Sequence, residues 1–242
     1  NKDTDGDGFL DGEEFAAGCS PTIPGPEDCT STIKAASQEK SLTEEFSELI
    51  AGGLFIGDLK TDSPNFSKSI AALGEEAMRK AAVLLTIDDS EIQINQTNND
   101  SQEARQNYVN QMSQIVEKYL VINTVSINQN APLTEEGFIN FDFAKNIEIL
   151  NQLYNEISDI SAPSSWLGFH KQALKFIKIS QLYYQNLGDF QKDPLKAMLT
   201  LSNASLISSE YQIIISDALS KIKEQGLNLP PNNILYLLSS RK

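Results

Sequence analysis

The chain has a single histidine, a single tryptophan and only two cysteines among its 242 residues. One histidine excludes a metal site built from several imidazoles. No serine lies in a G-x-S-x-G context of the kind that carries a hydrolase nucleophile. No apolar run reaches the roughly 18 residues that a membrane-spanning helix needs, so we expect no transmembrane segment in this chain.

Basic residues are also scarce. The chain has 19 Lys and Arg and 33 Asp and Glu, which gives a net charge of −14. A phosphate-binding surface needs clustered Lys and Arg, so this balance argues against a nucleic-acid partner. Residues 1–48 hold 12 acidic residues and 3 lysines, a balance of −9, which leaves −5 for the remaining 194 residues. Most of the acidity therefore lies near the amino terminus.

A twelve-residue stretch, Asp3–Glu14, has oxygen-bearing groups at the spacing of a calcium loop. Carboxylates fall at positions 1, 3 and 5, a glycine takes position 6, a backbone carbonyl position 7, and acids positions 9 and 12. Calcium needs six to eight oxygens from a short segment that can wrap around it. The sequence therefore predicts a Ca²⁺ site formed by Asp3, Asp5, Asp7, Phe9, Asp11 and Glu14. The alternative is an acidic solvated turn that binds nothing specific.

The run DTDGDGFLDGEE, within residues 3–17, resembles the EF-hand-like, thrombospondin type 3-like calcium repeats of secreted and surface-anchored bacterial proteins. The resemblance implies bound calcium in an extracellular setting and does not extend to residues 30–242. An EF-hand has a helix before its loop, but only Asn1 and Lys2 precede this one, and no second loop follows. Since the chain does not begin with Met, we expect that an upstream segment, such as a signal peptide or membrane anchor, has been removed.

Cys19 and Cys29 flank a turn that contains three prolines. We interpret them as a disulfide, which suits an oxidising compartment with millimolar calcium. Two free thiols are the alternative, and zinc is disfavoured because two sulfurs without a nearby histidine make half a site. The predicted domains are the calcium loop and cysteine turn at 1–30, a tether at 31–40, and a helical bundle at 41–242.

Apolar residues recur at three and four along most of residues 41–242, which predicts an all-α bundle of about six helices. Three helices are expected to begin near Ser41, near Pro163 and at Asp193-Pro194. Three others are expected to span about 65–86, 101–124 and 134–159. A last long helix is expected to end at Gly226. A connection at 87–100 shows weak alternation. After Pro230-Pro231, residues 232–239 are expected to form a short docking helix through Ile234, Leu235 and Leu238. The most apolar stretch, residues 49–57, is interpreted as core, with an exposed contact surface as the alternative.

The helix that follows Pro163 is apolar on two faces, so we expect it to be central in the bundle. It carries Trp166 and His170, and we interpret His170 as a hydrogen-bonded residue at the edge of the core; a pH-sensitive or catalytic role is the alternative. Its third face carries Lys171, Lys175 and Lys178. This lysine strip is expected to pair with acids on a neighbouring element, and an anionic partner is the alternative.

These observations predict an extracellular, surface-tethered, calcium-stabilised interaction or structural protein that is not an enzyme. Its partner is expected to be a protein or another envelope component. Two alternatives stay open. One is an enzyme acting on cell-wall glycan, which would need a deep cleft with converging carboxylates or His170 at its floor. The other is a subunit of an envelope secretion or pilus assembly, which would show an exposed apolar patch at residues 49–57 or along the lysine strip.

Overall fold

The computed structural model describes residues 4–6, 22, 40–127 and 141–229, with side chains described as far as Tyr119 in the helix that ends at Ile127. These residues contain seven α-helices and one pair of two-residue strands. The all-α class predicted from the sequence is confirmed. The helices divide into two compact units at Leu73, and each is described by itself. The domain limits predicted at residues 30 and 40 stay predictions.

The first unit contains α3, Leu42–Ile56, and the start of α4, Phe66–Val83. Ser41 caps α3, because its hydroxyl accepts from the Glu44 N–H while the Glu44 carboxylate accepts from the Ser41 N–H. Gly57 ends α3 with a φ of 90°, a left-handed conformation that glycine adopts without strain. The chain then folds back, so that Leu59 is buried and its N–H donates to the carbonyl of Gly53.

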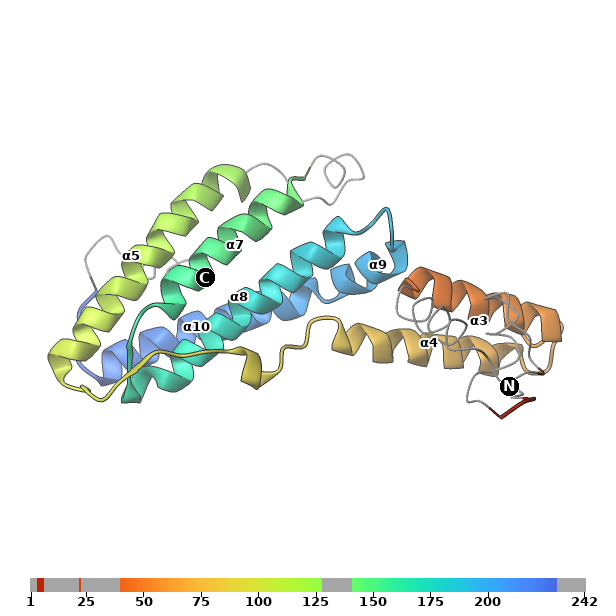
Figure 1. The fold of residues 1–242 in the computed structure, drawn as a ribbon, viewed down its shortest axis with the longest axis horizontal. Coiled ribbons are helices and arrows are strands. Elements are labelled where there is room, and N and C mark those ends of the chain that lie inside the picture. The colour runs from red at the N-terminus through yellow and green to blue at the C-terminus, as the bar shows by residue number, and fades with distance from the viewer. Residues whose placement is uncertain (1–3, 7–21, 23–39, 128–140, 230–242) are drawn as a thin grey trace. The chain divides into compact units, whose positions relative to one another are not determined.

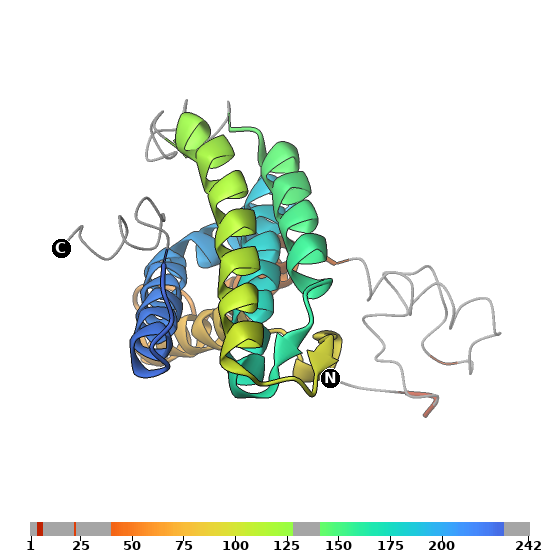
Figure 2. The ribbon, with the colours of Figure 1, turned by 90° about the vertical axis from the view of Figure 1, so that its left-hand side faces the viewer.

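The second unit is a helical bundle centred on α8, Leu167–Gly188. The long α5, Gln102–Ile127, packs against α7, Phe143–Ser158, and α7 packs along α8. Figures 1 and 2 show α5 and α7 side by side. On its other sides α8 contacts α9, Pro194–Ser202, and α10, Ala204–Glu224. The expectation that this helix is central is confirmed.

Local sequence signals set most of these helix ends. Asp142 and Asp193 cap α7 and α9, each accepting a hydrogen bond from a backbone N–H three residues on, and Pro194 occupies the first turn of α9. The predicted start of a helix near residue 134 was wrong, since α7 begins at Phe143 after the Asp142 cap. Residues 128–140 lie outside the described part of the chain.

Two short strands tie the ends of the α5–α7 pair together. Strand β1, Gln96–Thr97, pairs in parallel with β2, Ala162–Pro163. Next to it, the carboxylate of Asp100 accepts from the side chain of Arg105 and from the hydroxyl of Ser165, which opens the short 3₁₀-helix Ser164–Trp166. This junction fixes the start of α5 against the start of α8. A second 3₁₀-helix, Asp89–Glu91, lies in the connection before β1.

Candidate functional site

An apolar groove lies in the second unit, between α5 and α10, with α7 and α8 forming its floor. The helices α5 and α10 each pack against a floor helix, and within the described residues they are not among the closely packed pairs. Their facing side chains therefore leave space between them. The resulting cavity has a volume of about 220 Å³. We call this feature the α5–α10 groove.

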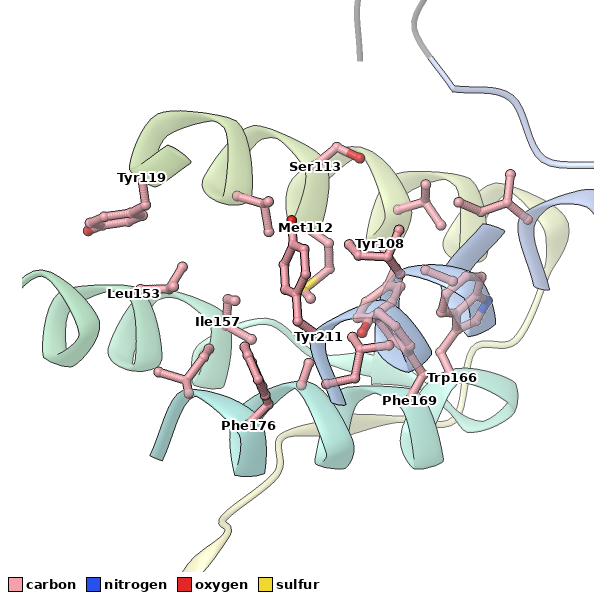
Figure 3. Close-up of a pocket in the computed structure, with 18 of the residues that line it drawn as sticks. Tyr108, Met112, Ser113, Tyr119, Leu153, Ile157, Trp166, Phe169, Phe176 and Tyr211 are labelled. Atoms are coloured by element: carbon pink, nitrogen blue, oxygen red, sulfur yellow. The ribbon is translucent and has the colours of Figure 1, made fainter. Parts of the chain in front are cut away.

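The lining of the α5–α10 groove comes from residues that repeat at helical spacing on four helices. In Figure 3, Tyr119 lies at one end of the groove and Trp166 at the other, with Met112 and Tyr211 between them. Ile157 of α7 and Phe169 and Phe176 of α8 contribute from the floor side, and Ile214 and Ile222 from α10. Such a surface suits an apolar ligand or the apolar face of a protein segment.

The Trp166 end of the groove is closed by an aromatic cluster. The ring of Trp166 lies 5.3 Å from that of Tyr108 and 5.4 Å from that of Phe169, measured between centroids. The indole N–H donates to Oε1 of Gln225 at 2.8 Å. Behind Tyr108 lies His170, which has no exposed surface. This end of the groove is therefore filled by packed side chains.

Polar groups in the groove are few. Ser113 is buried, and its hydroxyl has no hydrogen-bond partner in the described part of the chain. The Tyr119 hydroxyl donates to Glu156 at 2.6 Å and is held at the edge. Burial raises the pKa of the Tyr108 and Tyr211 hydroxyls, so both stay protonated at neutral pH. Since the described lining holds no carboxylate, lysine, arginine or histidine, it offers binding surface and no acid–base pair.

His170 is hydrogen-bonded as expected, but it is fully buried and does not lie at the edge of the core. Its Nδ1 lies 3.0 Å from the hydroxyl of Tyr108, and burial lowers its pKa from 6.5 to about 4. The imidazole is therefore neutral at physiological pH, and it lies beside the described lining of the groove and not within it.

The lysine strip on α8 pairs with acids of the 3₁₀-helix Asp89–Glu91, as expected from the sequence. Lys171 and Lys175 both contact the carboxylate of Asp89, at 2.9 and 2.7 Å, and Lys178 lies 3.8 Å from Glu91. The two lysines lower the pKa of Asp89 to about 2, with the hydrogen bond from Lys175 as the largest cause. The strip is thus largely neutralised within the chain.

The interpretation of residues 49–57 as core was wrong. Leu49, Ile50 and Leu54 are exposed on α3, and Phe55 and Ile56 near its end are 90% and 70% exposed. Within α3 only Leu42 and Phe46, in its first two turns, are buried. Apolar composition indicates that a segment favours burial, but it does not say whether the chain supplies a covering element. We call the exposed side chains of Leu49, Ile50, Leu54, Phe55 and Ile56 the α3 patch.

Most of the predicted calcium ligands lie outside the described residues: Asp3, Asp7, Phe9, Asp11 and Glu14. Cys19 and Cys29 lie outside them as well. Of the loop, Thr4, Asp5 and Gly6 are described, and Gly6 has a φ of 76°. Among the described residues there is no cluster of three or more His, Cys, Asp or Glu side chains placed to hold a metal ion. The calcium site and the disulfide therefore stay predictions.

The described helices also include none long and apolar enough to cross a lipid bilayer.

Sequence periodicity had assigned the residues of the α5–α10 groove to helix stripes, and it missed that two of these stripes do not meet. The only local signal was Ser113, a polar residue beside Met112 on a buried face.

No family model matches the chain, and neither a curated protein nor a solved structure shows significant similarity to it.

Proposed function

We propose that this chain is an extracellular, cell-surface-tethered helical interaction protein, stabilised by calcium bound at its amino-terminal loop. The observation that carries the proposal is the α5–α10 groove, which combines an apolar lining with an absence of acid and base groups among its described residues. A surface of this kind gains free energy by burying apolar area and has little means of moving a proton.

The shape of the groove favours a protein partner. It runs between two helices, and grooves of that kind receive the apolar face of a helix with anchors at i, i+3, i+4 and i+7. Aromatic and methionine side chains such as Tyr211 and Met112 supply the large, adaptable contact area that interaction sites use. The partner would be an envelope or extracellular protein.

The amino-terminal loop would add rigidity. Asp3, Asp5, Asp7, Phe9, Asp11 and Glu14 would hold the ion, and calcium bound there neutralises carboxylates that otherwise repel each other. The left-handed φ of Gly6, between Asp5 and Asp7, is compatible with a chain that curves tightly at this point. A filled loop would act as a stiff junction between the tethered end and the helical units.

A subunit of an envelope secretion or pilus assembly is the second candidate, and the α3 patch favours it. Five large apolar side chains exposed within eight residues of one helix are unusual on a surface that contacts only water. Burial against a neighbouring subunit would remove this area from solvent. The glycan-acting enzyme is less well supported, because the described lining of the groove contains none of the converging carboxylates that such a reaction uses.

The interaction proposal is tested by placing a photo-crosslinking amino acid at Val116, which lines the groove, and at Asn151, which is exposed on α7, as the matched control. After irradiation in the native envelope, position 116 is expected to capture one discrete protein and position 151 is not. Equal capture from both positions, or release of sugar products from envelope polymers by the purified chain, would contradict the proposal.

The calcium proposal is tested by calorimetric titration. Saturable binding is expected in the unaltered chain and in Asp62→Ala, which removes an exposed acid outside the loop, but not in Asp5→Ala. Equal heats in Asp5→Ala and the unaltered chain would show that the loop is only an acidic turn.

A further inference from the structure

The cavity of the α5–α10 groove is lined mostly by buried side chains. Val109 and Met112 of α5 and Ala218 of α10 are buried, whereas Val116 of α5 and Ile215 of α10 keep partial exposure. In the described part of the chain, the cavity therefore reaches solvent near these last two residues. Internal space lowers the stability of a protein when nothing fills it, because the lining atoms lose contacts on one side. A molecule of matching size would restore those contacts.

The volume of the cavity sets the size of that molecule. A protein cavity of about 150 Å³ with an apolar lining stays dry and binds benzene, a single six-membered ring. At the same volume per atom, the cavity of about 220 Å³ accommodates about nine heavy atoms. This is the size of a bicyclic ring, or of one ring with a short substituent.

Aromatic side chains at both ends of the cavity favour an aromatic occupant. At one end lie Trp166 and Phe169, whose rings meet edge to face (Figure 3). Toward the other end, Phe176 of α8 and Tyr211 of α10 have ring centroids 6.0 Å apart. The thioether of Met112 lies between these two pairs. Ring edges and a thioether sulfur both make favourable contacts with a further aromatic ring.

The charge of the lining limits the occupant to a neutral molecule. The described lining contains no Lys, Arg, His, Asp or Glu side chain that could pair with an ion. A charged molecule would lose its hydration on entry and would gain no partner in return. A neutral molecule incurs no such penalty.

Ser113 adds one polar group to this lining. Its side chain is 3% exposed, and its hydroxyl has no hydrogen-bond partner among the described residues. A serine inside a helix often donates to the carbonyl four residues earlier, as Ser180 of α8 does to Phe176 at 2.9 Å. Buried hydroxyls are normally paired, so that of Ser113 suits a molecule with a hydrogen-bonding group of its own.

We propose that the cavity of the α5–α10 groove binds a neutral aromatic molecule of about nine heavy atoms, which shares one hydrogen bond with the hydroxyl of Ser113. The inference does not rest on the proposed function. A protein partner would contact the rim of the groove, at residues such as Val116 and Tyr211, whereas this molecule lies inside it.

The first test compares small probes on the full chain. Indole has the stated size and one N–H donor, and benzoate has the same number of heavy atoms and a negative charge. At about ten times its dissociation constant, indole is expected to raise the unfolding temperature by about 3–6 °C in scanning calorimetry. Benzoate at the same concentration is expected to leave it unchanged. No shift with indole, or an equal shift with benzoate, would overturn the proposal.

An aliphatic probe separates an aromatic ligand from an acyl chain. 1-Octanol matches indole in heavy atoms and also carries one hydrogen-bonding group, but it has no ring. Indole is expected to bind more tightly in a calorimetric titration. Tighter binding of 1-octanol would assign the cavity to an acyl chain and would overturn the proposal.

The second test locates the bound probe. Ala218→Leu adds an isopropyl group inside the cavity, and Ala204→Leu adds the same group at an exposed position of α10. Indole is expected to lose its effect on the unfolding temperature of Ala218→Leu and to retain it in Ala204→Leu. A full shift in Ala218→Leu would place the probe elsewhere and overturn the proposal.

The third test concerns the polar contact and adds no volume, so it holds even if Ala218→Leu does not fold. Indene has the shape of indole without the N–H. In the unaltered chain indole is expected to bind about three to ten times more tightly than indene, because it alone can donate to Ser113. In Ser113→Ala this preference is expected to be lost or reversed, since the indole N–H then enters the cavity unpaired.

Calorimetric titration of both probes into both chains measures this preference. An unchanged preference for indole in Ser113→Ala would overturn the proposal. No partner protein is present in any of these experiments, so their outcome is independent of whether a partner is captured at Val116.

Discussion

The hydroxyl of Tyr108 lies 3.0 Å from Nδ1 of His170, and these two groups join α5 to α8 inside the core. Tyr108 is buried and lines the α5–α10 groove, whereas His170 lies behind it. The pair therefore couples the wall of the groove to the central helix of the bundle.

Removal of the Tyr108 hydroxyl is expected to destabilise the second unit. Tyr108→Phe leaves Nδ1 of His170 buried without its partner, at a cost of about 1–3 kcal/mol. Urea unfolding at pH 7 measures this loss as a lower midpoint with an unchanged slope. An unchanged midpoint would mean that Nδ1 finds another partner when Tyr108 lacks its hydroxyl.

The stability of the second unit should fall in acid in two separate pH ranges. Burial lowers the pKa of His170 from 6.5 to about 4. Between these two pH values the unfolded chain binds a proton at this side chain and the folded chain does not. Stability is therefore lost as pH falls from 6.5 to 4. Asp89 and Asp100, whose pKa values the neighbouring Lys and Arg side chains lower from 3.8 to about 2, add a second loss between pH 3.8 and 2.

Thermal unfolding between pH 7 and pH 2 separates these two ranges. His170→Gln removes the titrating group and should abolish the dependence between pH 6.5 and 4, while the loss below pH 3.8 is retained. A His170→Gln chain with the pH profile of the unaltered protein would contradict the assignment.

Two adjacent glycines of α3 should respond differently to alanine. A Cβ added at Gly52 meets nothing within 4 Å, so Gly52→Ala should stabilise the first unit by up to about 1 kcal/mol through helix propensity. A Cβ added at Gly53 lies 2.5 Å from Cδ1 of buried Leu59, so the Leu59 side chain must move. Gly53→Ala should therefore be the less stable of the two, which thermal unfolding of both variants measures; the reverse order would show that Leu59 repacks without cost.

Neutralisation of Asp89 should expose the charge of the lysine strip. Asp89→Asn removes the partner of Lys171 and Lys175, and we expect later elution of the folded chain from an immobilised polyanion. Because these groups are largely exposed, the unfolding temperature should change little. Asp159→Asn, which makes the same charge change at an exposed site, is the control, and equal elution of both variants would show that the strip is not specifically paired.

Helix positions and types could largely be predicted from the sequence because their determinants are local. The Asp193-Pro194 start and the Gly226 end act within one turn, and both lie where expected. The α7 start was missed because helical periodicity does not mark where a helix begins, and only the Asp142 side chain, which accepts from the N–H of Lys145, marks that point.

The candidate site depends on relationships that local patterns do not encode. Periodicity places Tyr108 and Met112 on one face of α5 and Ile214 and Ile222 on one face of α10, but the distance between those faces is set by how α7 and α8 pack. The α3 patch shows the same limit, since Phe55 has the composition of a core residue and no described element covers it.

The pairing of β1 with β2 has a consequence for folding kinetics. Gln96 and Ala162 are 66 residues apart (162 − 96), so their contact closes a loop that encloses α5 and α7, whereas α7 and α8 are neighbours along the chain. Closure of that loop loses chain entropy before the strands gain their hydrogen bonds, so the strand pair should form after the rate-limiting step. Asn95→Ala, which removes the hydrogen bond from Asn95 to the carbonyl of Ser158, should accordingly speed unfolding and leave the folding rate nearly unchanged. The two-residue strands would then set how long the bundle stays folded and not how fast it forms.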